Sequence, residues 1–168
     1  DLAMAAIEST GSNMTYELLE KETIGILAGK NSRIAKRLIS GTSVTLKDAW
    51  DDMFISLQEG HSIRVVQDKL FRRYGFTPDI LLETDSLEVG KRVALQAGAC
   101  MLLPNIYVDD YVRQQKGEFF PLADYDNHRH FYACYRKDEF IPRYTRDFIQ
   151  ITTSVLAKER ERELAYRV

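Results

Sequence analysis

Short apolar runs alternate with amphipathic segments along most of the chain. Runs rich in aliphatic residues predict buried strands at 23–28, 53–57, 79–83 and 99–103, and Pro104 ends the last of them. Between these runs apolar residues recur at helical spacing, and a glycine stands where each helix should end: Gly41, Gly75 and Gly98. This alternation of strand and helix predicts an α/β protein with a largely parallel sheet.

The predicted helices have polar residues at their starts. Asn31 is the expected N-cap of the first helix, whose apolar face comprises Ile34, Ala35, Leu38 and Ile39. A short helical turn is expected at 46–50. The next helix should begin near Ser62, and the third should be capped by one of three residues, Thr84, Asp85 or Ser86.

The sequence changes character after residue 104. Residues 105–128 are polar and aromatic, with one short strand predicted at 118–120 and another following at 130–136. Pro142 suits the first turn of a last helix, whose apolar positions are Tyr144, Phe148, Ile151 and Val155. The charge-dense tail at 158–167 should continue this helix in solvent or fray.

Composition and charge exclude several classes of protein. The 168 residues carry 23 basic and 25 acidic side chains, and 45% of them are hydrophobic. A net charge of −2 argues against nucleic-acid binding by this chain alone, and no apolar run reaches the roughly 20 residues that span a bilayer. Because the chain begins inside an apolar strand without an initiator Met, we expect it to be a piece of a longer protein.

Two cysteines, Cys100 and Cys134, are far apart and fit no zinc or thioredoxin-like motif. Both lie in apolar, strand-like stretches, so we expect buried and inert thiols, with a redox sensor as the alternative. Unpaired thiols are typical of a reducing compartment, which favours a cytoplasmic protein.

Several stretches in order resemble one family. A strand, a glycine-containing loop and an arginine-bearing helix start fall at 54–64, a helix exit with Gly75-Phe76-Thr77-Pro78 follows at 70–80, and an acidic-x-x-Ser-Leu helix runs through Ala97-Gly98 to Pro104 at 83–104. Asp1-Leu2-Ala3-Met4 and the ending at 135–142 fit the same pattern. Together they resemble the effector domain of LysR-type transcription regulators over nearly the whole chain.

The resemblance implies a periplasmic-binding-protein-like fold of type 2, with two Rossmann-like lobes joined by crossover strands. Residues 1–21 would be a remnant of the first lobe and a crossover, 22–104 the nearly complete second lobe, and 105–168 the return crossover and the final strand and helix of the first lobe. The small-molecule effector would bind in the cleft between the lobes. DNA would be bound only through an upstream helix-turn-helix. Because half of the cleft is missing on this map, we expect weak or no effector binding.

Two helix starts are the candidate effector site. Both should follow strands whose carboxyl ends face one crevice, where free backbone N–H groups and hydroxyls suit a polar or anionic ligand. The candidate residues are Gly60, His61, Ser62, Arg64, Thr84 and Ser86, with His61 and Arg64 as the cations for a carboxylate. We expect the hydroxyls of Ser62, Thr84 and Ser86 to face one concavity. Finding the two helix starts on opposite faces of the sheet would contradict this expectation. The alternative is that each residue only caps its helix and that Arg64 is a surface or interface charge.

The helix that begins at Ser62 is the predicted dimer interface. Its apolar residues form more than one stripe: Ile63, Val65, Val66, Leu70 and Phe71. Leaving Val65 or Phe71 bare would cost about 1.5–3 kcal/mol each, so we expect a homodimer or higher homo-oligomer centred on this helix, as the resemblance also implies. The alternative is that the lobe absorbs the whole stripe in its own core.

Other kinds of site have weaker support. Asp124, Asp126, His128 and His130 suggest a metal site, but their alternation in a polar loop favours a solvated surface, so no metal and no cofactor is predicted. Phosphate-binding loops and nucleophile motifs are absent from the sequence, which argues against an enzyme. The predicted function is therefore effector sensing in a LysR-type regulator. A solute-binding protein of a transporter is the alternative, and a small α/β enzyme is a third option.

Overall fold

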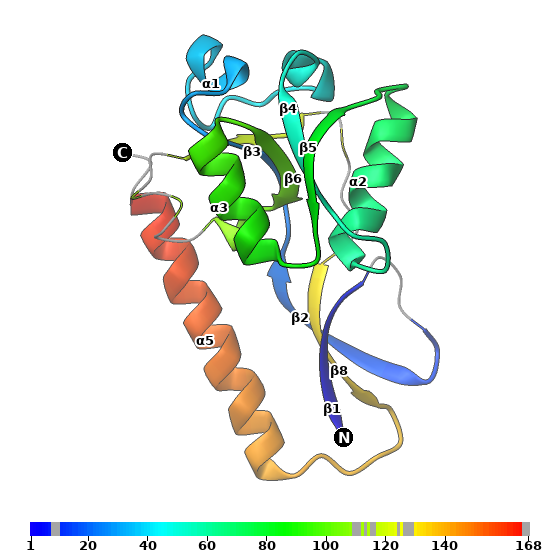
Figure 1. Cartoon of the computed structure of the whole chain (residues 1–168). Coiled ribbons are helices and arrows are strands. Elements are labelled where there is room, and N and C mark those ends of the chain that lie inside the picture. The colour runs from blue at the N-terminus through cyan, green and yellow to red at the C-terminus, as the bar shows by residue number, and fades with distance from the viewer. Residues whose placement is uncertain are drawn as a thin grey trace. The chain divides into compact units, whose positions relative to one another are not determined.

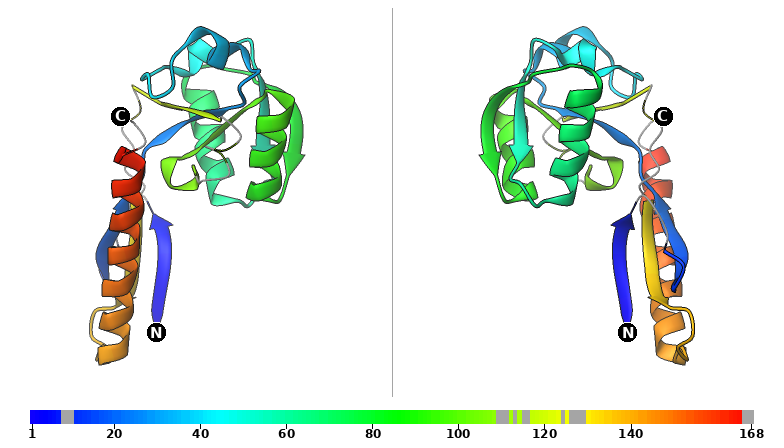
Figure 2. Two further views of the ribbon diagram at one scale, coloured as in Figure 1. Left: turned by 90° about the vertical axis from the view of Figure 1, so that its left-hand side faces the viewer. Right: turned by 90° about the vertical axis from the view of Figure 1, so that its right-hand side faces the viewer.

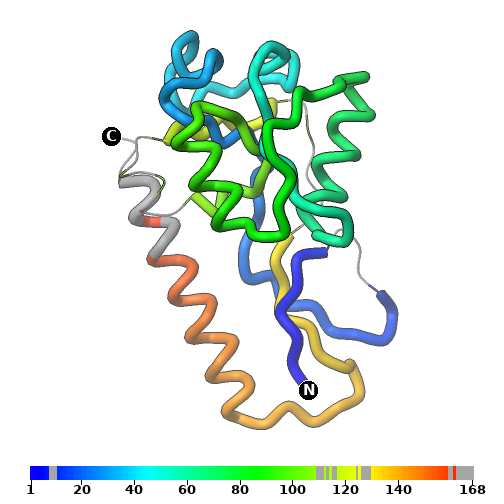
Figure 3. Tube along the Cα trace, viewed as in Figure 1, coloured from blue at the N-terminus to red at the C-terminus, as the bar shows by residue number. Residues whose placement is uncertain are grey.

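In the computed structural model (Figure 1) the chain folds into two compact units. Unit 1 comprises Asp1–Glu22 and Asn127–Val168, and unit 2 comprises Thr23–Asp126. The structure describes residues 1–7, 11–108, 112, 114, 117–123, 125 and 130–165, with the backbone alone for 159, 160 and 162–165 (Figure 3). The division into lobes and crossovers expected from the resemblance stays a prediction.

Unit 2 is built on a five-stranded sheet with the order β5-β4-β6-β3-β7. Its strands are β3 (Ile24–Ala28), β4 (Met53–Leu57), β5 (Asp79–Thr84), β6 (Cys100–Pro104) and β7 (Glu118–Pro121). Strand β4 pairs in parallel with β5 and β6, whereas β3 pairs antiparallel with β6 and β7. The predicted strands are confirmed, but the sheet is mixed rather than largely parallel. The hydrophobic pattern of a buried strand is the same in both directions, so it could not reveal the reversal of β3.

Helices α2 (Ser62–Arg73) and α3 (Leu87–Ala97) cover opposite faces of this sheet (Figure 1). On one face Phe54 packs with Val66 and Leu70 of α2, and on the other Ile55 packs with Ala94 of α3. The connections explain this arrangement. The chain leaves β4 for its neighbour on one side and then returns past it to β6, so two right-handed crossovers place their helices on different faces.

Unit 1 is a three-stranded antiparallel sheet covered by a long helix. Its strands are β1 (Leu2–Ile7), β2 (Met14–Lys21) and β8 (His130–Arg136), with β8 in the centre. Helix α5 (Arg143–Ala165) lies along one face of the sheet (Figure 2) and packs its Ile149 against Leu19 and Ala133. The sequence did not predict β2, because charged residues interrupt its apolar positions.

Unit 2 also contains the short helices α1 (Arg33–Arg37), η1 (Leu46–Ala49) and η2 (Asn105–Tyr107). The N-cap of α1 is Ser32 and not the predicted Asn31, because the Ser32 hydroxyl accepts from the Ala35 N–H. The helix also ends at Arg37, which leaves Ile39 outside it and exposed instead of on its apolar face.

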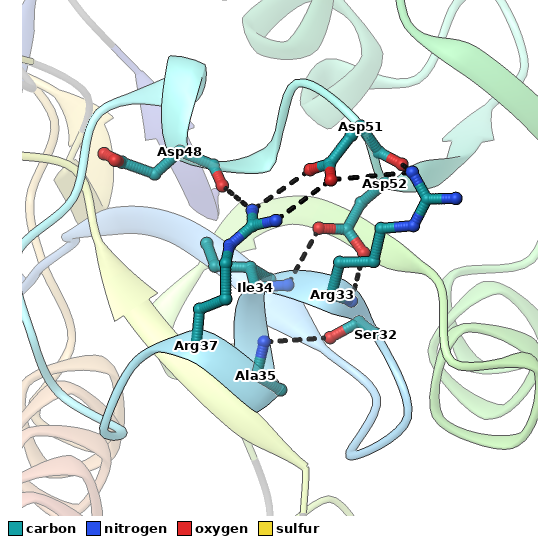
Figure 4. Close-up of polar contacts among 8 residues, drawn as sticks. All are labelled: Ser32, Arg33, Ile34, Ala35, Arg37, Asp48, Asp51 and Asp52. Carbon is teal, nitrogen blue, oxygen red and sulfur yellow. Dashed lines mark hydrogen bonds and ion pairs between the residues drawn. The ribbon is translucent and has the colours of Figure 1, made fainter.

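A polar network holds α1 in place (Figure 4). The buried carboxylate of Asp52 accepts from the backbone N–H of Arg33 at 2.6 Å and from that of Ile34 at 3.0 Å. Beside it the Arg37 guanidinium donates to both carboxylate oxygens of Asp51, at 2.9 and 3.0 Å, and lowers the pKa of that carboxyl. A helix of five residues is unstable alone, so these caps, together with packing, determine whether α1 forms.

We expect Asp52→Ala to destabilise unit 2 by about 1–3 kcal/mol, because two backbone N–H groups lose their acceptor in a buried position. Asp52→Asn keeps one acceptor and should cost less. Asp51→Ala is the control, since it removes an ion pair but no helix cap. Urea unfolding of the three variants measures the difference, and equal losses in all of them would contradict the capping role.

Candidate functional site

The starts of α2 and α3 meet at one edge of the sheet, where the parallel strands β4 and β5 end. The Gln58 N–H, one residue beyond β4, donates to the carbonyl of Thr84 at the end of β5, at 2.9 Å. Both helices thus start at the carboxyl ends of β4 and β5, but they cover opposite faces of the sheet (Figure 1). The expectation that their hydroxyls face one concavity stays a prediction.

Helix α2 begins at a histidine cap. His61 is its N-cap, with Nδ1 accepting from the Ile63 N–H at 3.4 Å, and Ser62 is the exposed first residue of the helix. An imidazole that accepts through Nδ1 in its neutral form carries its proton on Nε2. Gly60 has a φ of 91°, a conformation that favours glycine, so its backbone explains its presence without a ligand.

Two hydroxyls accept backbone hydrogen bonds at the start of helix α3. The Ser86 hydroxyl accepts from the Val89 N–H at 3.3 Å, and the Thr84 hydroxyl accepts from the Ser86 N–H at 3.2 Å. Ser86 is thus the cap among the three candidates the sequence offered. Both hydroxyls use lone pairs for these bonds, which leaves the O–H proton of each available for a further partner.

Arg64 is already paired within unit 2. Its Nε donates to Asp68 at 2.8 Å, and its Nη1 donates to the carbonyl of Leu57 at 2.7 Å and to the Glu83 carboxylate. The hydrogen bonds to Asp68, which has the larger effect, and to Glu83 raise the pKa of Arg64. This guanidinium therefore ties α2 to the ends of β4 and β5, in line with the alternative of a structural charge.

Two buried polar residues were missed by the sequence analysis. Gln67 lies inside unit 2, where its carboxamide joins β4 to β6. The Lys91 ammonium is buried 2.7 Å from the Glu88 carboxylate and donates to the carbonyl of Tyr107. Gln67 follows Ile63 by four residues and precedes Leu70 by three, so a polar residue on the apolar stripe was the available signal.

The predicted dimer residues are mostly internal. Ile63, Val66, Leu70 and Phe71 are buried in unit 2, and Val65 alone among the five is exposed, at 60%. The expectation that Phe71 would be bare is wrong, because its ring packs against Phe54 and Phe76 with centroids 5.6 Å apart in both pairs.

Beside this helix lies a groove of about 590 Å³, lined by α2 and by the edge strand β5. The residues on its walls include Asp68 and Arg72 of α2 and Ile80 and Glu83 of β5. The groove opens on the same side of the sheet as α2.

The remaining candidates concern metals, thiols and membranes. Asp124, Asp126 and His128 lie outside the described residues, and no group of three metal-ligating side chains occurs among those described. Both cysteines are buried as predicted, and burial raises the pKa of each thiol. Within the described part of the chain, no helix is long and apolar enough to cross a membrane.

Comparison with known proteins gives one consistent result. A family model described as the LysR substrate binding domain matches residues 1–157. No curated protein matches the sequence.

Solved structures with the same fold share little sequence. The effector binding domain of QuiR in complex with shikimate is 17% identical, with a TM-score of 0.69 over 94% of this chain and 72% of that one. The regulatory domain of Synechocystis CcmR in complex with 2-PG is 15% identical, with a TM-score of 0.74 over 93% and 73%. A putative LysR family regulator from Pseudomonas aeruginosa is 22% identical, with a TM-score of 0.71 over 93% of this chain but 53% of that one.

These matches confirm the expected periplasmic-binding-protein-like fold of type 2 and do not favour the transporter alternative. The matched family is one of transcriptional regulators. With a family model that covers residues 1–157 of 168, the chain belongs to the LysR family as a substrate-binding domain.

Proposed function

We propose that the chain senses a small polar or anionic metabolite at the edge of unit 2 where β4 and β5 end. The observation that carries this proposal is the hydrogen bond between Gln58 and Thr84, which joins the two loops that start α2 and α3. Helices of 12 and 11 residues direct the positive ends of their dipoles to this edge. The hydroxyl protons of Thr84 and Ser86 and the Nε2–H of His61 add neutral donors, which a carboxylate ligand would accept from.

The family supports two further parts of the proposal, which concern DNA binding and location. We propose that DNA is bound by a helix-turn-helix elsewhere in the full-length protein, since this chain has a net charge of −2. We also place the protein in the cytoplasm, where free thiols such as those of Cys100 and Cys134 stay reduced. The first two relatives bind shikimate and 2-PG, which makes small carboxylates and other anions the first ligands to test.

Titration with shikimate and 2-PG should shift the backbone amide signals of the two helix starts, and weak binding is expected. Ser86→Ala removes a donor to the ligand and should weaken binding by about tenfold or more, because a hydrogen bond to a charged group contributes about 1.5–3 kcal/mol. The measurement is a two-dimensional NMR titration of the ¹⁵N-labelled chain.

Ser32→Ala is the matched control for this titration. Ser32 also caps a helix of unit 2, but it follows β3, whose carboxyl end lies at the opposite edge of the sheet because β3 is antiparallel to β6. This variant should lose stability without any change in the titration. Shifts at the start of α1, or equal responses of the two variants, would count against the proposed site.

We further propose that the regulator forms a homodimer through α2 and β5. Val65 is 60% exposed on α2, and Ile80 and Leu81 are 41% and 44% exposed on β5. Strand β5 is an edge of the sheet, and exposed apolar edge strands tend to pair with another chain. The surface therefore comprises Val65 and the edge of β5, without Phe71.

Val65→Lys should weaken this dimer by at least about tenfold in its dissociation constant, because a charge would have to be desolvated in an apolar contact. Val89→Lys is the control, since Val89 is 46% exposed on α3 at the opposite face. Sedimentation equilibrium measures both variants. A wild-type chain that stays monomeric at high concentration would refute the proposed dimer.

A further inference from the structure

The two central parallel strands of unit 2 are joined by very little backbone pairing. Strands β4 and β6 each have five residues, and both are almost entirely buried. In the part of the chain that the structure describes, one residue pair, Phe54 with Cys100, connects them. Beyond this pair the strands continue to their carboxyl ends, where buried N–H and C=O groups need other partners.

The carboxamide of Gln67 supplies those partners. Its Oε1 accepts from the N–H of Leu57 on β4 at 3.2 Å, and its Nε2 donates to the carbonyl of Leu102 on β6 at 3.1 Å. The Ser56 hydroxyl donates to the same Oε1 at 3.2 Å. The side chain is 0% exposed. A carboxamide has the donor and acceptor of a peptide group, so Gln67 acts as an inserted peptide link between the strands.

The link lies close to the point where each of the two strands ends. Leu57 is the last residue of β4, and the loop 58–61 leads from it directly into α2. Leu102 lies two residues before Pro104, where β6 ends and the chain continues into η2. The two connections leave neighbouring parallel strands in different directions, and in open α/β sheets ligands bind at such a point.

We propose that Gln67 is the positioning residue of the loop 58–61. It sets the spacing of β4 and β6 at their carboxyl ends and, through Leu57, the place where α2 begins. That this loop contacts a ligand rests on the proposed function. That Gln67 positions the loop does not depend on it.

Three hydrogen bonds explain why glutamine is required. Leucine has a similar volume, but it would leave the Leu57 N–H and the Leu102 carbonyl without partners in the buried seam, that is, the interface between β4 and β6. Ionised glutamate would keep the acceptor for Leu57 but would place a second acceptor against the Leu102 carbonyl. Protonated glutamic acid could donate there again, so Gln67→Glu should regain the link at low pH.

Amide hydrogen exchange measured by NMR tests this placement. In Gln67→Leu the Leu57 amide should exchange at least about tenfold faster relative to the amide of Ile26, which lies on β3 of the same sheet. Asp52→Ala is the matched control, because it destabilises unit 2 away from the seam and should change both amides alike. If Gln67→Leu also changes both amides alike, Gln67 contributes only to overall stability and the proposal is wrong.

The glutamate variant adds a pH profile that overall destabilisation would not produce. Burial should raise the carboxyl pKa of Gln67→Glu above its unfolded value, so the penalty is present above that pKa and is relieved as the pH falls through it. Leu57 protection, relative to Ile26, should then recover at low pH. Protection that stays low at all pH values would contradict the proposed link.

If neither variant folds, the wild-type chain still decides the question. The Gln67 Nε2 protons should then exchange as slowly as the Leu57 amide, and fast exchange of these protons would overturn the proposal. Shikimate titration of the same samples separates the two hypotheses. Normal Leu57 protection in a wild-type chain that ignores shikimate and 2-PG would count against the proposed ligand class and leave the role of Gln67 intact.

Discussion

The backbone of Leu57 hydrogen-bonds to two side chains of the helix that comes after it. Gln67 accepts from its N–H, and Arg64 donates to its carbonyl. Buried backbone groups must find partners, and the single residue pair between β4 and β6 cannot supply them all. The end of the strand, the loop and the start of α2 therefore fix one another. The loop in turn holds the end of β5 through the bond from Gln58 to Thr84.

Much of unit 2 could be predicted from the sequence, because strands β3, β4 and β6 are buried on both faces and helices α2 and α3 on one. Such burial gives the strands continuous apolar runs and gives the helices apolar residues at helical spacing. The sequence therefore predicted β4, β5, β6, α2 and α3. Strand direction leaves no such trace, which is why the reversal of β3 was missed. The opposite placement of α2 and α3 depends on the order of the strands, and a hydrophobic pattern does not contain that order.

The candidate site was predicted at the level of its helix starts and missed in its supporting contacts. Gly60 lies in the expected loop and Ser86 is one of the three expected caps, whereas His61, expected as a cation for the ligand, is the N-cap of α2. Gln67 and Lys91 were missed because pattern analysis assigns a polar residue to the surface, whereas each of these is buried with partners in its own unit. A polar residue on an apolar stripe is the signal that separates such cases.

Capping and ligand binding are not competing roles at this edge. A hydroxyl that accepts from a backbone N–H keeps its own proton, and its side chain is held in one rotamer before any ligand arrives. Ser86 and Thr84 are therefore preorganised donors, which lowers the entropy lost on binding. Arg64 is the opposite case, since its Nε and Nη1 already donate to Asp68, Glu83 and the backbone, and recruiting it would break two ion pairs. An anionic ligand would thus be recognised here by neutral hydroxyls and helix N-termini, whereas Arg64 holds α2 against the ends of β4 and β5.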